Sequence, residues 1–475
     1  MTTPSESPSG GANLVVVANR LPVRGVDQDG ERVWTTSPGG VVSALVPVLR
    51  DAHGLWIGWA GDAGDGQAPP REHEGIALRD VAITEEEYDA FYLGFSNATL
   101  WPLYHDAIRP ATYDRSWWHA YRSVNERFAD AAAAGAAPGA TMWVQDYQLQ
   151  LVPKLLRERR PDLRIGFFLH IPFPPRELFL QLPWRREILE GLLGADLVGF
   201  QVAGGATNFT RLARQVAGVT GGRGTIDVDG REVHVGTFPI SVDNTTFAAR
   251  ARDPDIQARA RTLRTELGDP EQLLLGVDRL DYTKGIDRRI RAVGELFDEG
   301  ALDPTRHVVV QIAVPSREEN AHYQREREQL ERLIGEVNGE HATVGRSPIH
   351  YLYQSLPADE LTALYLAADV MLVTALRDGM NLVAKEYVAS RTDNQGVLVL
   401  SEFAGAADEL STAIRVNPHD IEGMKDAIMD AVEMPPTEQR KRMRKLRHRV
   451  QEHDVVAWSR GFLAALAGSR KANAS

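Results

Sequence analysis

The chain repeats one pattern along most of its length. Short apolar runs rich in β-branched residues alternate with longer amphipathic segments of helical spacing. The runs lie at 14–17, 55–59, 141–144, 165–169 and 197–200, and then again at 273–277, 307–312, 370–373 and 397–400. An alternation of strand and helix is typical of a parallel sheet with helices on both faces. We therefore expect an α/β chain with two doubly wound domains.

The restart of this pattern indicates where the first domain ends. A chain of 475 residues is too long for one ordinary domain. Between the two series of runs, Pro239 interrupts a strand-like segment, and a polar stretch precedes a charged, helix-like segment at 253–267. We expect a disordered tail, an N-terminal domain, a second domain, and a C-terminal helix that crosses back to the N-terminal domain. Their expected ranges are 1–13, 14–242, 243–454 and 455–475.

Two further segments predict helices. The alanine-rich stretch at 130–140 ends in Pro138 and Gly139, which is typical of a helix followed by its stop signal. The basic stretch at 440–449 contains apolar residues three and four apart, namely Met443, Leu446 and Val450. This spacing favours a solvated helix with a buried stripe over a nucleic-acid patch.

Composition excludes several classes of protein. A net charge of −12 argues against general nucleic-acid binding, so any phosphate chemistry needs local basic pockets. The absence of cysteine excludes disulfides, Cys-ligated zinc and iron–sulfur clusters. The tripeptide Asp227-Val228-Asp229 precedes a glycine between strand-like runs, which predicts a hairpin turn rather than a metal site. Residues 1–13 lack the basic start and apolar stretch of a signal peptide, and no apolar run approaches the length of a membrane span, so we expect neither. We expect a cytoplasmic protein without membrane partners and without a protein-bound metal.

A strand-to-helix segment in the second half has the features of an anion site. Residues 376–386 follow the apolar run 370–373 and pass through Gly379 into a helix-like stretch. Open N–H groups at a helix start attract a phosphate. Glu386, about two helical turns further on, could accept hydrogen bonds from a ribose. The alternative is an ordinary connection whose charges are solvated.

A second basic cluster follows another strand of the same half. Arg279 and Lys284 lie in the segment 277–285, with the sequence VDRLDYTKG. Such a pair can neutralise the charge that grows on a departing diphosphate. The alternative is a surface ion-pair network with the nearby carboxylates, Asp278, Asp281 and Asp287. Because carboxyl ends of parallel strands share one edge of a sheet, both clusters can reach one ligand.

The N-terminal half contains weaker signals. Arg20 follows the first strand-like run, and Gly39 and Gly40 could let the backbone approach an anion, although a glycine pair is more often only a turn. No Gly-x-Gly-x-x-Gly follows the first strand and no P-loop is present, which argues against a dehydrogenase and a P-loop kinase.

Aromatic and polar residues in this half suggest a sugar site. Tyr92 and Trp101 offer flat apolar faces with polar tips, while Asp146 and His170 come at strand ends. The alternative is that the neighbouring aromatic residues are core and that His170 is structural.

Together these segments resemble a known enzyme family. The motifs FSNATLWP, WVQDYQL, GFFLHIPFP, RLDYTKG, LRDGMNLVAKEYVA and GVLVLSEFAGAA are similar to those of trehalose-6-phosphate synthases. The resemblance runs from about residue 14 to about residue 466. It implies a GT-B glycosyltransferase fold, with two Rossmann-like domains facing a cleft. It also implies retaining transfer of glucose from a nucleotide sugar, typically UDP-glucose, to glucose 6-phosphate, giving α,α-trehalose 6-phosphate.

The resemblance also implies roles for individual residues. Arg279, Lys284, Asp378 and His170 are expected at the reacting groups. Donor binding is assigned to Gly39, Gly40, Arg279, Lys284, Asp378, Gly379, Met380, Asn381, Leu382, Val383, Ala384, Lys385 and Glu386. Acceptor binding is assigned to Arg20, Tyr92, Trp101, Asp146 and Arg317. The nucleotide sugar is a co-substrate, so no cofactor is expected.

Alternatives to this activity remain open from the sequence. A related synthase could use another acceptor, such as glycerol 3-phosphate, or a donor base other than uracil. A non-catalytic member could bind sugar phosphates and regulate a partner, although such a member should have lost some of the residues named above. A glycosidase would need a paired acid and nucleophile. We also expect a homo-oligomer, either a dimer or a tetramer.

Overall fold

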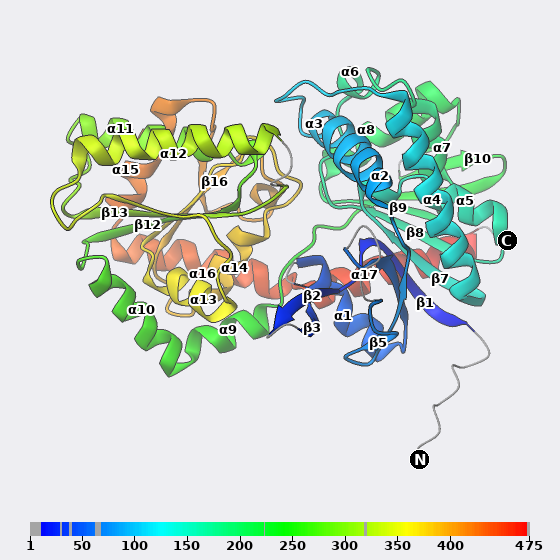
Figure 1. The fold of residues 1–475 in the computed structure, drawn as a ribbon, viewed down its shortest axis with the longest axis horizontal. Coiled ribbons are helices and arrows are strands. Elements are labelled where there is room, and N and C mark those ends of the chain that lie inside the picture. The colour runs from blue at the N-terminus through cyan, green and yellow to red at the C-terminus, as the bar shows by residue number, and fades with distance from the viewer. Residues whose placement is uncertain are drawn as a thin grey trace, which may run out of the picture. The chain divides into compact units, whose positions relative to one another are not determined.

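The chain folds into two compact α/β units. The structure, a computed structural model, describes residues 11–28, 31–37, 40–61, 68–222, 224–317 and 321–472. Within these residues, the first unit runs to Pro239 and resumes at Trp458, while the second unit spans Ile240–Ala457. Figure 1 shows the elements of each unit.

The first unit is built on a mostly parallel sheet. The described strands pair in the order β10-β11-β9-β8-β7-β1-β4-β6-β5, with parallel pairing from β11 to β6. Val16 of β1 lies opposite Trp143 of β7. The bounds are β1 Ala12–Arg20, β4 Leu55–Trp59, β5 Glu72–His73, β6 Ile76–Asp80, β7 Ala136–Gln145, β8 Arg164–Leu169, β9 Leu197–Phe200, β10 Thr225–Val228 and β11 Arg231–Thr237. A separate hairpin joins β2 Val23–Gln28 to β3 Glu31–Thr36.

Helical segments connect these strands. Their bounds are α1 Gly40–Asp51, α2 Glu85–Glu87, α3 Trp101–Tyr104, α4 Arg115–Gly135, α5 Val152–Arg159, α6 Arg176–Phe179, α7 Arg185–Leu193, α8 Ala203–Leu212 and α17 Val455–Ala472. Short 3-10 and π-helical segments are η1 Tyr88–Leu100, η2 Tyr147–Leu149 and η3 Ala213–Ala217. The long π-helical segment η1 is unusual, and π-helical turns are frequent at functional sites.

One sequence-based helix boundary is wrong. Helix α4 ends at Gly135 and β7 begins at once, so Pro138 and Gly139 lie inside a strand. The pairing of β7 with β1 shifts register across this stretch, which forms a bulge with Gly139 at φ 69°. Bulges accommodate proline and glycine because the ladder of hydrogen bonds is already interrupted there.

The C-terminal helix α17 packs against the sheet of the first unit. The Phe462 ring stacks on Trp143 of β7 with centroids 4.6 Å apart, and Trp458 lies 5.1 Å from the same ring. Gly166 and Gly199 lie under Phe462, where an added Cβ would approach its ring to 2.8 and 2.7 Å. Glycine at these two strand positions therefore makes room for the helix.

The second unit has an entirely parallel sheet in its described residues. The strand order is β14-β13-β12-β15-β16-β17. The bounds are β12 Gln272–Arg279, β13 His307–Val314, β14 Ile349–Leu352, β15 Val370–Val373, β16 Val397–Ser401 and β17 Ile414–Val416. The apolar runs expected as strands in this half lie within these elements. Buried parallel strands read as continuous apolar runs because both faces are covered.

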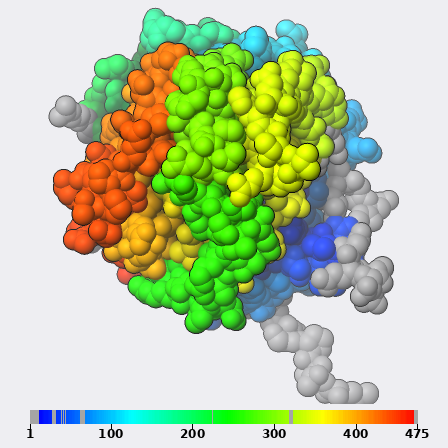
Figure 2. All heavy atoms as spheres, turned by 90° about the vertical axis from the view of Figure 1, so that its left-hand side faces the viewer, coloured from blue at the N-terminus to red at the C-terminus, as the bar shows by residue number. Residues whose placement is uncertain are grey.

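Helices cover both faces of this sheet. In Figure 1, α11 and α12 lie on one face, and α13 and α16 lie on the other. The bounds are α9 Asn244–Arg252, α10 Pro254–Glu266, α11 Ile286–Asp298, α12 Ala321–His341, α13 Ala358–Ala367, α14 Leu382–Ser390, α15 Ile421–Val432 and α16 Pro436–Glu452. The short 3-10 turns are η4 Tyr282–Lys284 and η5 Gly405–Asp408. Figure 2 shows the green segment that contains α10 on the surface of this unit. As expected, α16 buries Met443, Leu446 and Val450.

Candidate active site

The connection from β12 to α11 is closely packed. Asp281 accepts a hydrogen bond from the Thr283 N–H at 2.9 Å and so begins the short turn η4. Gly285 follows with φ 61°, a conformation that favours glycine. A Cβ at Gly285 would lie 2.5 Å from the carbonyl oxygen of Thr374. The glycine therefore lets this connection lie directly against the backbone that follows β15.

Lys284 and Asp378 form a buried ion pair. The Lys284 Nζ lies 2.6 Å from Asp378 Oδ2, and the two side chains are only 9% and 15% exposed. Asn381 donates to the same carboxylate oxygen at 3.1 Å. The alternative expected from sequence was a network with Asp278, Asp281 and Asp287. The ammonium instead bonds across to the segment after β15, so the two clusters meet.

The start of helix α14 is defined by Asn381. This residue has φ 79°, and its side chain accepts from the Ala384 N–H at 3.0 Å. The first N–H groups of a helix have no partner within the helix, and here they belong to Leu382 and Val383. The Ala406 N–H donates to the Met380 carbonyl at 2.8 Å, which anchors the preceding loop containing Gly379. The helix start therefore has the backbone geometry expected of an anion site.

Two neighbouring residues of α14 point to different surroundings. Glu386 is half-buried, and its Oε2 accepts a hydrogen bond from the Tyr365 hydroxyl at 2.9 Å. Burial raises the pKa of Glu386 above its usual value. The Lys385 ammonium instead donates to the Ile240 carbonyl at 2.7 Å and to the Glu409 carboxylate. Its side chain thus anchors the helix, which leaves only its backbone for the donor role expected from sequence.

Arg317 is held by a buried carboxylate of the same unit. Asp281 Oδ2 accepts from Arg317 Nη1 at 3.0 Å and from the Tyr323 hydroxyl at 3.0 Å. Burial opposes ionisation of Asp281, but the charges of Arg317, Arg279 and Lys284 outweigh it and lower its pKa to about 2. Arg279 itself ends β12 with an exposed side chain. These basic residues therefore surround an ionised Asp281.

Arg289 is fully buried and bonds to side chains from three segments of the second unit. Its Nη1 contacts Asp278 Oδ2 and Gln311 Oε1, each at 2.7 Å, and its Nε donates to Thr374 Oγ1 at 3.0 Å. The Arg289 side chain is 0% exposed and that of Asp278 is 2% exposed. One guanidinium thus connects β12, β13 and the segment after β15.

In the first unit, three of the expected residues lie at neighbouring strand ends. Arg20 is the last residue of β1, Asp146 follows β7, and His170 follows β8. These strands are adjacent and parallel, so their carboxyl ends lie on the same edge of the sheet. In an open α/β sheet this edge is where ligands bind.

Arg20 lies on an aromatic surface. Its Cζ is 4.0 Å from the centroid of the Trp59 ring and 5.7 Å from that of Tyr92, which stacks on Tyr88. Gly61, at φ 105°, leaves space for the guanidinium, because an added Cβ would lie 2.2 Å from Arg20 Nη1. The aromatic faces stabilise the cation and fix its position.

Asp146 adopts a backbone conformation that is rare for a residue other than glycine. Its φ is 69° and its ψ is 174°. The backbone is held there because the Asp146 N–H donates to the Phe168 carbonyl at 2.8 Å, and Asp146 Oδ1 accepts from the His170 N–H at 3.1 Å. Such a conformation costs on the order of 1–3 kcal/mol and is concentrated at functional sites.

His170 is uncharged at neutral pH. Burial lowers its pKa to about 3. Its Nε2 lies 2.9 Å from Gln145 Oε1, so with this orientation of the amide Nε2 carries the proton. The ring can therefore act as a neutral hydrogen-bonding group rather than as a cation. Trp101 begins α3 directly after η1, and its ring is 5.7 Å from that of Tyr147, the residue after Asp146.

Some features of these sites were not expected from sequence. Gly39 lies outside the described residues, and Gly40 is the first residue of α1. The contacts of Asp281 with Arg317, of Tyr365 with Glu386, and of Arg289 with Asp278 were all missed. Asp281 belongs to a motif that sequence reasoning singled out, whereas Tyr365 lies in an apolar helix without any such signal.

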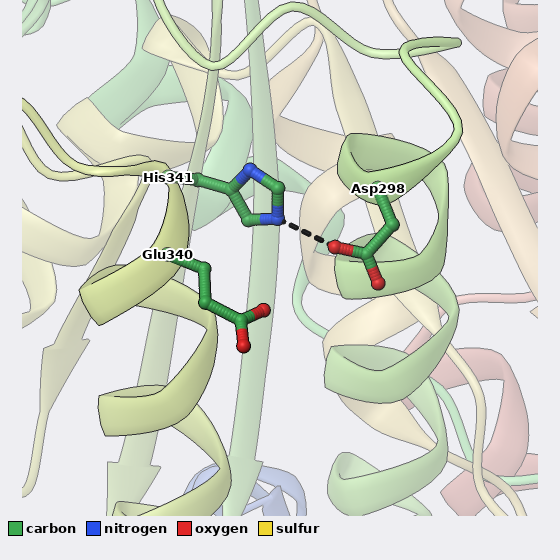
Figure 3. Close-up of side chains that lie close together, drawn as sticks. All are labelled: Asp298, Glu340 and His341. Carbon is green, nitrogen blue, oxygen red and sulfur yellow. Dashed lines mark hydrogen bonds and ion pairs between the residues drawn. The ribbon is translucent and has the colours of Figure 1, made fainter.

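One group of side chains has the composition of a metal site. Among the described residues, Asp298, Glu340 and His341 bring potential ligand atoms within 4.8 Å of one another (Figure 3). His341 Nε2 is already 2.8 Å from Asp298 Oδ1, and both carboxylate residues are exposed. Asp298 is the last residue of α11, and Lys284 lies just before that helix. The 13 residues of α11 therefore separate the group from Lys284 by about 20 Å. We assign no metal to this exposed group.

Within the part of the chain that the structure describes, no helix is both long enough and apolar enough to cross a membrane.

Comparisons with known proteins identify the family. A model of glycosyltransferase family 20 matches residues 12–468. The trehalose-6-phosphate synthase of Mycolicibacterium gilvum is 56% identical over 481 residues, covering 98% of this chain and 96% of the relative. The enzyme of that name from Mycobacterium tuberculosis is 55% identical over 478 residues, covering 97% and 95%.

Solved structures give the same result. A UDP-forming α,α-trehalose-phosphate synthase from Burkholderia xenovorans, in complex with glucose-6-phosphate, is 36% identical with a TM-score of 0.88 and covers 96% of this chain and 100% of its own. An E. coli structure bound with UDP-2-fluoro glucose is 34% identical, has a TM-score of 0.88 and covers 95% and 98%. The likeness confirms the predicted α/β class with two parallel-sheet units. The chain therefore belongs to glycosyltransferase family 20.

Proposed function

We propose that this chain is a retaining glucosyltransferase that moves glucose from UDP-glucose to glucose 6-phosphate. The products are α,α-trehalose 6-phosphate and UDP. The observation that carries the proposal is the Lys284–Asp378 contact, in a chain 56% identical to a trehalose-6-phosphate synthase. It joins the segment whose basic residues suit a departing diphosphate to the segment that the resemblance assigns to donor binding.

The proposed donor site lies in the second unit. The diphosphate binds at the start of α14, where N–H groups and the helix dipole favour an anion. Arg279 and Lys284 add positive charge, Asp378 accepts from glucose hydroxyls, and Glu386 accepts from the ribose. The E. coli relative, whose structure is bound with UDP-2-fluoro glucose, supports this choice of donor.

The acceptor site combines charge with aromatic surface. Arg20 binds the acceptor phosphate through a guanidinium whose position Trp59 fixes. The assignment of Arg317, in the second unit, to acceptor binding stays a prediction; its guanidinium has enough N–H groups to bind a phosphate while keeping its bond to Asp281. Tyr92 and Trp101 flank the sugar, and Asp146 accepts from a hydroxyl. The glucose-6-phosphate complex of the Burkholderia relative supports this choice of acceptor.

Retention is explained by attack on the face from which the diphosphate leaves. A double displacement would need a carboxylate nucleophile close to the anomeric carbon. In the proposed step, the bond from the anomeric carbon to the diphosphate oxygen breaks, and the acceptor hydroxyl oxygen bonds to that carbon. The departing phosphate oxygen takes the hydroxyl proton. Lys284, Arg279 and the start of α14 stabilise the negative charge that develops on the diphosphate. His170, being neutral, hydrogen-bonds a sugar hydroxyl near the reacting carbon.

A donor and acceptor panel tests the activity. The protein is mixed with UDP-, ADP- or GDP-glucose and with glucose 6-phosphate or glycerol 3-phosphate, in chelator and then with added Mg²⁺. We expect product NMR to show an α,α-linked trehalose 6-phosphate, formed from UDP-glucose and glucose 6-phosphate with or without the metal. A different linkage or acceptor, or release of free glucose alone, would overturn the proposal. A homo-oligomer and a cytoplasmic location stay predictions.

A further inference from the structure

We propose that Tyr365 positions Glu386 for the donor ribose and thereby controls how strongly the enzyme selects a donor with both ribose hydroxyls. The inference rests on the proposed function, because it requires a nucleotide-sugar donor. It adds a residue from α13, which lies outside every motif that the sequence associates with the donor.

The geometry of the pair is well defined. Tyr365 is fully buried, and its hydroxyl donates to Glu386 Oε2 at 2.9 Å. Glu386 is half-buried on α14, four residues after the first residue of that helix. A glutamate side chain has several rotatable bonds, and fixing it on ligand binding costs conformational entropy. A hydrogen bond from a rigid, buried phenol fixes the carboxylate before the ligand arrives.

Neighbouring contacts hold the helix that carries Tyr365 in place. Arg259 of α10 bonds to Glu360 of α13 through two nitrogens, with Nη2 at 2.8 Å and Nε at 2.9 Å. Arg391, which follows α14, donates to the Tyr365 carbonyl at 3.1 Å. Helix α13 is thus tied both to the surface helix α10 and to the end of the donor helix. The hydroxyl of Tyr365 has little freedom to move away from Glu386.

The chemistry of a carboxylate explains the effect on the ribose. Two carboxylate oxygens offer about four lone-pair sites. With one site taken by Tyr365, the remaining sites suit the two adjacent hydroxyls of a ribose. The Tyr365 hydrogen bond also favours the ionised carboxylate against the burial that opposes ionisation, and Arg250 of α9 adds a charge in the same direction. An ionised Glu386 accepts from both hydroxyls, whereas a protonated carboxyl does so less well.

The substitution Tyr365→Phe removes only the hydroxyl and keeps the buried ring. We expect the donor KM to rise by up to about tenfold, since binding must then order the Glu386 side chain, and the rotamer freedom lost by a glutamate corresponds to about that factor. The turnover number and the acceptor KM should change by less than about twofold, because the ribose is remote from the reacting carbon. A general loss of structure would instead affect all three constants.

The chain offers a matched control in Tyr387→Phe. Tyr387 is also fully buried, it lies in α14 next to Glu386, and its hydroxyl has no hydrogen-bond partner among the described residues. Removing that hydroxyl should leave the donor KM unchanged. Thermal unfolding of both variants checks that neither substitution disturbs the fold.

The decisive experiment compares UDP with 2′-deoxy-UDP and 3′-deoxy-UDP by calorimetry in the wild type, Tyr365→Phe, Glu386→Gln and the double variant. The wild type should prefer UDP, and Tyr365→Phe should lose most of that preference. The double variant should be no worse than Glu386→Gln, because both substitutions remove one interaction. A Tyr365→Phe protein with wild-type preference overturns the inference. If the wild-type protein binds UDP but makes no disaccharide, the proposed function fails, and the deoxy-UDP comparison still tests the role of Tyr365. If the wild-type protein does not bind UDP, the proposed function and the role of Tyr365 both fail.

Discussion

The two sheets carry their candidate sites at the same place but build them from different side chains. Each site lies at the carboxyl ends of neighbouring parallel strands. In the second unit these ends carry buried ion pairs, such as Lys284 with Asp378 and Asp281 with Arg317. In the first unit Arg20 lies on Trp59, and a neutral His170 lies beside Gln145. The difference fits the proposed diphosphate ligand in the second unit and the proposed sugar phosphate in the first, where one phosphate is the only charged group.

The two sites also hold their charged side chains in position by different means. Paired charges in the second unit fix each other, because removing one partner leaves a buried charge uncompensated. Aromatic packing and close backbone contacts in the first unit fix a single cation by shape and by attraction to the ring faces. We therefore expect substitutions in the second unit to have larger effects than those in the first.

The largest effect is expected from Arg289→Met. It leaves the buried Asp278 side chain without its partner, and should lower the free energy of unfolding by about 3–5 kcal/mol. Denaturant unfolding measures this loss. Adding Asp278→Asn should recover part of it. The counterpart in the first unit is Arg157→Met, which removes the partner of Asp196. Because the Arg157 side chain is 19% exposed, this substitution should lower the free energy of unfolding by less. Equal costs would contradict the difference between the units.

The next effect concerns turnover. Lys284→Ala should lower kcat about 100-fold or more, because the ammonium stabilises charge that develops only as the diphosphate departs. Steady-state kinetics with UDP-glucose as the varied substrate measures it. Lys441→Ala is the control, since that side chain is 66% exposed on α16 and should leave kcat unchanged. A rise in donor KM with an unchanged kcat would show that Lys284 only binds the ground state.

A smaller effect is a pH dependence of stability. The pKa of Asp281 is lowered from 3.8 to about 2, and each unit corresponds to 1.36 kcal/mol, so its ionisation contributes about 2 kcal/mol to folding. A lowered carboxyl pKa gives stability that is present above the unfolded pKa and is lost as the pH falls toward the folded one. The stability advantage of wild type over Asp281→Asn should therefore shrink between pH 4 and pH 2, by about 2 kcal/mol. A difference that does not change with pH would exclude this contribution.

The smallest effect is expected in the first unit. Gly61→Ala would bring a methyl group against Arg20 Nη1 and should raise the KM for glucose 6-phosphate by up to about tenfold, with little change for the donor. Gly139→Ala is a matched control, because Gly139 also has a positive φ, at 69°, but no atom lies within 4 Å of its added Cβ. If both variants raised the acceptor KM equally, backbone strain rather than the position of Arg20 would be responsible.

Much of the fold was predictable because its strands are buried on both faces. The apolar run 370–373 corresponds to strand β15, Val370–Val373, and the runs 55–59 and 197–200 correspond to β4 and β9. The helix boundary at Gly135 was not predictable from Pro138 and Gly139, because proline and glycine also suit a bulge. The pattern shows where strands occur but not where a ladder is interrupted.

The site was predictable one segment at a time. The segments containing Lys284 and Asp378 were both singled out, yet their contact joins residues 94 positions apart, and no spacing rule reaches that far. Lys385 shows the converse limit, because it lies within the motif while its side chain bonds to Glu409. The role proposed for Tyr365 could not be predicted, because the sequence of a largely apolar helix does not show whether a tyrosine hydroxyl in it bonds to a functional residue.

The backbone of Asp146 has a consequence for engineering this protein. Its φ of 69° and ψ of 174° are accessible almost only to glycine. Replacing Asp146 by glycine relieves the strained conformation but deletes a carboxylate at the candidate acceptor site. A selection for heat resistance alone would accordingly favour a sturdier protein with an impaired acceptor site. Thermostabilising libraries for this enzyme should keep position 146 fixed.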